Sequence, residues 1–128
     1  MFGANTKHSV VAYIDNDPAA DDFLPIWVAP LACEIVGANV MITNAVSGDT
    51  ANYFDLALYN GGTAGTATTA LAGTIGGTAG WSALVPNAFT ISNGTVTAGQ
   101  LVTLHYNETG TGTFGAMAVQ LDYVIGQA

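Results

Sequence analysis

The heptapeptide Tyr53-Phe-Asp-Leu-Ala-Leu-Tyr59 alternates strictly between two sets of side chains. Phe54, Leu56 and Leu58 fall on one face of an extended chain, and the intervening residues fall on the other. Asn60-Gly-Gly62 follows immediately and is a turn signal. The stretch therefore predicts a β-strand with one buried face, ended by a tight turn.

The same pattern recurs along the chain, and helical periodicity is almost absent. The other predicted strands are 8–14, 23–28, 32–43, 66–74, 101–106 and 116–125. The alternation predicts a core that contains Phe54, Leu56, Leu58, Val102, Leu104, Val119 and Leu121. In 32–43 the predicted apolar face consists of Val36, Ala38, Val40 and Ile42. Regularly spaced turn signals favour an all-β fold, an antiparallel jelly-roll-like β-sandwich of about eight strands.

The domain organisation is predicted to be simple. Residues 10–126 form a single β-sandwich domain, and residues 1–9 form a polar N-terminal arm without the apolar segment of a secretory signal. The most apolar window, 23–43, is interrupted by Pro25 and Pro30, which argues against a membrane-spanning helix. We expect a protein made in the cytoplasm with no membrane partner.

The segment 61–80 is rich in Gly, Thr and Ala, and the pentapeptide Gly-Gly-Thr-Ala-Gly occurs at 61–65 and again at 76–80. We interpret the two copies as turns on either side of the short predicted strand 66–74. A disordered linker is the competing interpretation, because glycine-rich chains are costly to order.

Charge is scarce and unbalanced. Lys7 is the only basic residue, nine acids give a formal charge of −8, and only 8% of the residues are charged. An ordinary soluble domain carries about a quarter charged residues. Phosphate binding needs clustered Lys and Arg, so nucleic acid is excluded as a partner. A weakly charged surface is typical of proteins whose neighbours cover part of it, which points to an assembly component.

Catalytic and cofactor motifs are missing from the sequence. His8 and His105 are the only histidines, and Cys33 is the only cysteine, set in an apolar stretch that suggests a buried, inert thiol. Asp55 and Asp122 could form a two-carboxylate site, but acids that point outward from strands are far commoner. We therefore expect no enzyme activity, no catalytic residue and no cofactor.

An acidic cluster at Asp15, Asn16, Asp17, Asp21 and Asp22 raises the question of calcium. The spacing fails the EF-hand pattern, since Ala19 and Ala20 occupy positions that need a ligand and a glycine. A solvated acidic turn is the simpler interpretation, and no metal site is predicted.

Six aromatic residues could form a platform that stacks on sugars, although core packing and subunit contact explain them at least as well. The residues in question are Trp27, Tyr53, Tyr59, Trp81, Tyr106 and Tyr123. The residues predicted to make interactions are Lys7 and His8 in the arm, as a tether to a partner, together with Trp27 and Trp81.

The order of these motifs resembles small jelly-roll proteins of tailed-phage virions. The resemblance covers roughly residues 10–126 and is a pattern of hydrophobicity and turns rather than a functional signature. It rests on Phe23-Leu-Pro-Ile-Trp-Val-Ala-Pro30, the strand 32–40, the strand and turn 54–62, the segment 96–104 and the terminus 121–126.

The resemblance implies a structural protein of a bacteriophage virion, with no catalytic residue carried over. Its members are capsid decoration (cement) proteins, head fibres or tail components. The leading expectation is a decoration protein that binds the major capsid protein on the outside of an icosahedral head and stabilises it, as a homotrimer. The alternative is a carbohydrate- or receptor-binding β-sandwich module of a head fibre or tail.

Overall fold

The computed structural model describes residues 6–15, 21–112 and 114–126, and within them the chain forms eleven strands. Their bounds are β1 (His8–Ile14), β2 (Asp21–Val28), β3 (Cys33–Ile42), β4 (Val46–Ser47), β5 (Tyr53–Asn60), β6 (Thr69–Ala70), β7 (Gly80–Trp81), β8 (Asn87–Ala88), β9 (Thr95–Val96), β10 (Leu101–Thr109) and β11 (Met117–Ile125). The strands β1, β2, β3, β5, β10 and β11 have seven or more residues, and the other five have two each.

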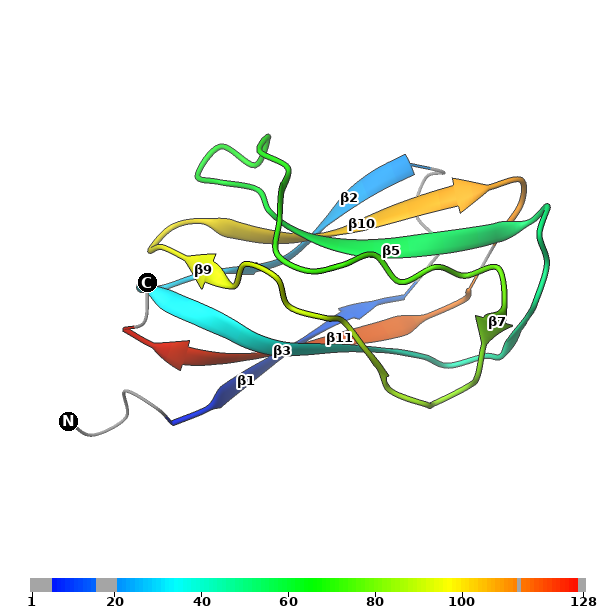
Figure 1. The fold of residues 1–128 in the computed structure, drawn as a ribbon, viewed down its shortest axis with the longest axis horizontal. Coiled ribbons are helices and arrows are strands. Elements are labelled where there is room, and N and C mark those ends of the chain that lie inside the picture. Colours follow the sequence, from blue (N-terminus) through cyan, green and yellow to red (C-terminus); the bar gives the residue numbers. More distant parts are fainter. Residues whose placement is uncertain (1–5, 16–20, 113, 127–128) are drawn as a thin grey trace.

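The long strands form two facing sheets (Figure 1). The first sheet has the order β1-β11-β3-β8, with β9 also paired to β3, and the second has the order β2-β10-β5-β6. All pairings between these strands are antiparallel. A small ribbon of β4 and β7 lies at the end of the sandwich away from the described ends of the chain (Figure 1).

The first four long strands alternate between the sheets, with β1 and β3 in the first and β2 and β5 in the second. The strand β10 then pairs with β5 in the second sheet, and β11 returns to the first. The last two strands each insert beside strands from the beginning of the chain. This interleaving is that of a jelly roll, in which two Greek keys fold over each other. The predicted all-β, antiparallel jelly-roll-like sandwich is confirmed.

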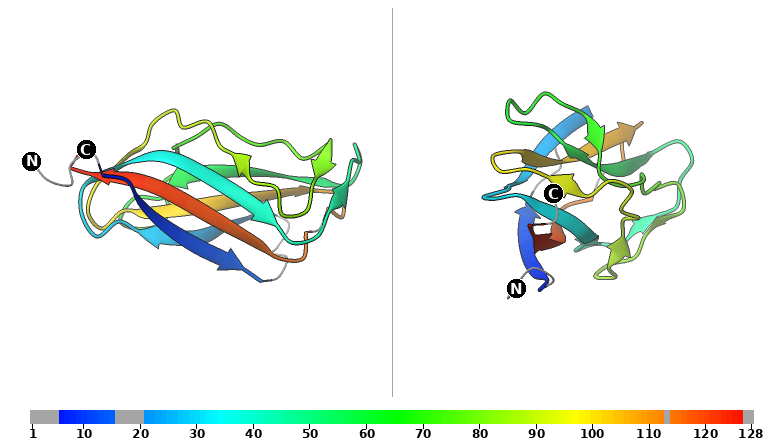
Figure 2. Two further views of the ribbon diagram at one scale, coloured as in Figure 1. Left: turned by 90° about the horizontal axis from the view of Figure 1, so that it is seen from below. Right: turned by 60° about the vertical axis from the view of Figure 1, so that its left-hand side comes forward.

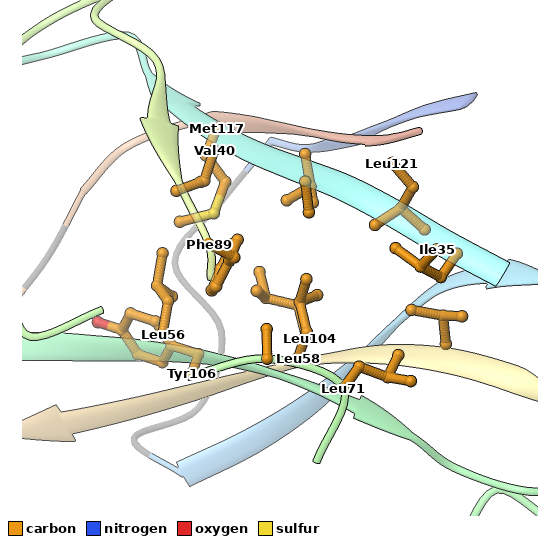
Figure 3. Close-up of a cluster of buried hydrophobic side chains, with 14 of the residues drawn as sticks. Ile35, Val40, Leu56, Leu58, Leu71, Phe89, Leu104, Tyr106, Met117 and Leu121 are labelled. Carbon is orange, nitrogen blue, oxygen red and sulfur yellow. The ribbon is translucent and has the colours of Figure 1, made fainter. Parts of the chain in front are cut away.

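The core lies between the two sheets, and side chains from both inner faces interdigitate there (Figure 3). All seven residues predicted for the core, Phe54, Leu56, Leu58, Val102, Leu104, Val119 and Leu121, are fully buried. Tyr106 is buried among them, and its hydroxyl donates to the carbonyl oxygen of Gly112 at 2.7 Å. The alternation in β5, β10 and β11 thus produces the predicted hydrophobic layer.

A β-bulge overturns one detail of the prediction. Val36 was predicted on the apolar face, but it is exposed. The ladder shifts register here, because Asp122 pairs with Gly37 whereas Tyr123 pairs with Ile35. Val36 is the extra residue of the bulge, and one extra residue reverses which side chains face inward. Ile35 is therefore the buried residue.

The glycine-rich segment is ordered along one side of the sandwich, although the strand predicted over 66–74 shrinks to β6. Backbone bonds fasten the segment instead: Leu56 and Ile75 exchange two hydrogen bonds of 3.0 and 2.8 Å, and Leu71 N donates to Leu58 O at 3.0 Å. The strands β8 and β9, which pair with β3, continue this covering. Together with the glycine-rich segment they cover the side of the sandwich formed by β5 and β3 (Figures 1 and 2). The linker interpretation of 61–80 is therefore wrong.

Candidate functional site

Two of the four predicted interaction residues, His8 and Trp27, pack on Tyr123. His8 stacks on Tyr123 with ring centroids 5.4 Å apart, and Trp27 packs on the same tyrosine at 4.7 Å. His8 is not in an arm, because it and Ser9 are the first residues of β1. Residues 1–5 of the predicted arm lie outside the described residues. The cluster joins the edge strands β1 and β2, so it is a structural contact between the two sheets.

Lys7 lies beside a network centred on Asp122. Ser9 donates a hydrogen bond of 2.6 Å from its hydroxyl to Asp122 Oδ1, and Gln120 donates one of 3.1 Å from its side-chain amide. The Ser9 bond lowers the pKa of the Asp122 carboxyl most, and the Gln120 bond and the Lys7 charge lower it further against partial burial. The network ties β1 to β11, and Lys7 itself is exposed.

Trp81, predicted as an interaction residue, is buried in the core. Its ring lies against Phe54, so it offers no exposed surface on which a sugar could stack. The prediction fails because Trp81 occupies the two-residue strand β7, whose pairing with β4 folds it inward. Sequence alternation carries no signal in a strand so short.

The acidic cluster falls partly outside the described residues, since Asn16 and Asp17 are not described. Asp15 is exposed after β1, and Asp21 and Asp22 begin β2. Within the described part of the chain, no three His, Cys, Asp or Glu side chains lie close enough to hold a metal ion. Asp21 instead forms a hydrogen bond with Nε2 of His105 on the adjacent strand β10.

The first sheet presents an exposed apolar face, which we call the outer apolar surface: Tyr13, Met41, Leu84 and Ala118. Tyr13, Ala118 and Met41 are neighbours across β1, β11 and β3. They line a hollow of about 330 Å³ together with Leu84, with Asp15 at its rim. Tyr13 and Leu84 are 77% and 72% exposed. Contiguous exposed apolar patches can mark sites of interaction with a partner.

The backbone conformation of Leu84 is unusual as well. Its φ is +60°, and among the described residues it is the only one other than glycine with a positive φ. A branched side chain in this region costs about 1–3 kcal/mol, and such outliers cluster at functional sites. Leu84 N donates to Ile42 O at 2.8 Å, which holds the residue over the edge of the hollow. Nothing in the sequence signals this conformation.

The second sheet carries a smaller hollow on its own outer face, of about 150 Å³. Ala57 forms its floor in the middle of β5, and the side chains around it come from β5, β10 and the loop after β6. The residues around the floor are Asp55, Tyr59, Thr74, His105 and Asn107. Only Asp55, Tyr59 and His105 were singled out by the sequence.

Cys33 is buried, as predicted, and burial raises the pKa of its thiol, which disfavours the reactive thiolate. Within the described residues, no helix is long and apolar enough to cross a membrane.

Comparison with known proteins gives one similar structure. No protein-family model and no curated protein matches the sequence. A chain in the structure of infectious bursal disease virus, Gx strain, is similar to 94% of the present chain, with 16% sequence identity and a TM-score of 0.40. This chain spans 34% of the length of that chain.

Proposed function

We propose that the chain is a structural protein of a virion, namely a capsid decoration (cement) protein that binds the outer surface of an icosahedral phage head and stabilises it. Its partner in this proposal is the major capsid protein, and the protein needs no catalysis and no cofactor. A jelly-roll fold hosts many functions, so the fold alone does not carry the assignment. The outer apolar surface carries it.

Tyr13 and Leu84 support a docking role because both are large, apolar and mostly exposed. Burying one such side chain against a partner contributes about 1.5–3 kcal/mol. The strained backbone of Leu84 is costly in the free protein and has no structural role in the core, which supports a role at an interface.

Binding to the assembled shell would stabilise it by mass action, since ligand that binds only the intact lattice shifts the equilibrium away from disruption. Many copies per particle add to this effect. The single Lys in the chain cannot form a network of ion pairs, so the contact is mainly apolar and hydrogen-bonded.

Self-association as a homotrimer is part of the proposal. The strand β1 lies at the edge of the first sheet, and no other described strand pairs with its outer side. Its sequence, His-Ser-Val-Val-Ala-Tyr-Ile, lacks the Lys or Pro residues that normally protect sheet edges. A neighbouring copy would cover this edge in a closed ring. Sedimentation at concentrations like those on a capsid tests it, and a strictly monomeric protein would contradict it.

The decisive experiment is to strip the protein from particles, add back variants and measure the temperature at which the genome is released. Leu84→Asn and Tyr13→Ser remove the apolar groups, and Asn tolerates the positive φ of position 84. Both variants should fold and yet restore little of the stabilisation. Val28→Thr, on the exposed part of β2, is the matched control and should restore it fully.

Two outcomes would contradict the proposal. The first is that stripped and decorated shells release the genome at the same temperature. The second is that Leu84→Asn and Tyr13→Ser protect as well as the unchanged protein, which would remove the outer apolar surface from the contact.

A further inference from the structure

The hollow over Ala57 is a consequence of one small residue among larger ones. On the outer face of β5, Ala57 lies between Asp55 and Tyr59, and it pairs across the ladder with His105 of β10. Ala57 is 5% exposed but is not part of the core cluster, because its methyl group faces away from the core. The neighbouring side chains rise around the methyl group and leave a depression one side chain deep.

The rim of this hollow is dense in hydrogen-bonding groups. Asp55 supplies a carboxylate, Asn107 supplies an amide that donates and accepts, and Tyr59 and Thr74 supply hydroxyls. These groups come from two adjacent strands and a loop, and they converge on a floor that is apolar. Such a combination of a small apolar surface and a few convergent polar groups is typical of ligand sites.

Two of the rim groups are held in place before any ligand arrives. Asp55 Oδ1 accepts a hydrogen bond of 2.8 Å from the backbone N–H of Gly77, which leaves Oδ2 for a ligand. His105 is bonded to Asp21 and stacks on Phe23, with centroids 4.3 Å apart and ring planes 14° from parallel. A site whose side chains are already fixed loses less conformational entropy when a ligand binds.

The volume of the hollow and the negative charge around it limit which ligands can bind. A volume of about 150 Å³ is enough for one six-membered ring. Asp55 and Asp21 lie near the hollow in a chain of net charge −8, so phosphates, sulfates and acidic sugars would be repelled. A pyranose offers C–H groups for the floor and several hydroxyls for the carboxylate, amide and hydroxyls of the rim.

We propose that the hollow over Ala57 binds a single neutral pyranose. This site lies on the sheet opposite the outer apolar surface, so a shell-bound copy would present it outward to solvent. The inference does not depend on the decoration role, because each surface can be altered without touching the other.

The test is a titration of the whole protein with methyl glycosides of glucose, galactose, mannose and N-acetylglucosamine, followed by amide chemical shifts in NMR. At least one glycoside should shift the amides of Ala57, Thr74 and Asn107. Ala57→Leu fills the hollow and should abolish these shifts, whereas Ala98→Leu, in an exposed turn, should leave them unchanged. Asn107→Ala, at an exposed position, should weaken binding about tenfold without affecting the fold.

Three results would overturn the proposal. One is that none of the four glycosides shifts the amides around the hollow at millimolar concentration. Another is that binding survives in both Ala57→Leu and Asn107→Ala. The third is that a sialic acid glycoside binds as tightly as the neutral sugars, because the acidic rim would then not select its ligand. Particle stabilisation by Ala57→Leu should equal that of the unchanged protein, which separates this test from that of the decoration role.

Discussion

Trp81 lies flat against Phe54, with ring centroids 5.1 Å apart and ring planes 3° from parallel. The two residues come from strands that do not pair with each other, β7 and β5. Phe54 also contacts Tyr106 and Phe114, at centroid distances of 5.3 and 5.5 Å. The four rings pack together in the core. Figure 1 shows β7, the strand of Trp81, at one end of the sandwich.

Removal of the Trp81 ring should therefore destabilise the fold. Trp81→Ala is expected to lower the free energy of unfolding by about 3–5 kcal/mol, because the cavity cannot refill. Trp81→Phe should lower the free energy of unfolding by less. It keeps an aromatic ring, and it removes the buried Nε1, which has no hydrogen-bond partner within the described residues and is therefore itself unfavourable. Urea unfolding followed by circular dichroism measures both. A loss below about 1 kcal/mol for Trp81→Ala would show that this packing contributes little.

Gly77 should not tolerate a side chain. A Cβ at this position would lie 1.9 Å from Phe54 O and 2.8 Å from Trp81 Nε1, so Gly77→Ala must displace the backbone or the indole ring. We expect a loss of at least about 2 kcal/mol. Gly73→Ala is the matched control, because a Cβ there meets nothing within 4 Å. The control should be neutral or stabilising by up to about 1 kcal/mol, and equal losses in the two variants would contradict the structure.

The Ser9–Asp122 bond should make stability depend on pH. The pKa of Asp122 is lowered in the folded chain, so its ionised form favours folding. This contribution is complete above the unfolded pKa of about 3.9 and is lost as the pH falls through the lower folded pKa.

Ser9→Ala should thus reduce stability at pH 7 by less than about 1 kcal/mol, because the pair is largely solvated, and the difference should shrink toward pH 2. Thr43→Val is the control: it removes a bond of 3.2 Å from the Thr43 hydroxyl to Ala116 O that involves no titrating group. Its effect should be the same at both pH values. A Ser9→Ala effect independent of pH would refute the assigned role of Asp122.

Attachment to a shell should depend weakly on salt, if the decoration proposal holds. Raising the ionic strength from 0.1 to 1 M shortens the screening length from about 10 to about 3 Å, and an apolar contact with one Lys per chain should change affinity by no more than about threefold. Binding isotherms on stripped particles measure this. A steep loss of affinity with salt would indicate a charged contact instead of the outer apolar surface.

Much of the fold was predictable because its main signal is local. The alternation of β5 places Phe54, Leu56 and Leu58 on one face by strand geometry alone, and all three are buried. The turn signal at 60–62 breaks the pattern where the chain lacks side chains that favour strands. Fold class and most of the core follow from such short-range information.

The candidate surfaces were much less predictable. Tyr13 lies on the exposed side of β1, and its neighbours Ala118 and Met41 come from distant parts of the chain. Leu84 has no sequence signal for its positive φ, and Trp81 had equal grounds for being buried or exposed. The hollow at Ala57 depends on which residues of β10 stand opposite it.

The sequence by itself determined which residues can form strands, which face of most long strands is apolar, and that the chain carries almost no basic groups. Only the tertiary structure decided the pairing order of the strands, the bulge at Val36 and the side of each sheet that stays open to solvent. The physical reason is the range of the interactions. Side-chain alternation is set by adjacent peptide units, whereas register and exposure are set by hydrogen bonds and packing between distant segments, such as Ser9 and Asp122, which are 113 residues apart.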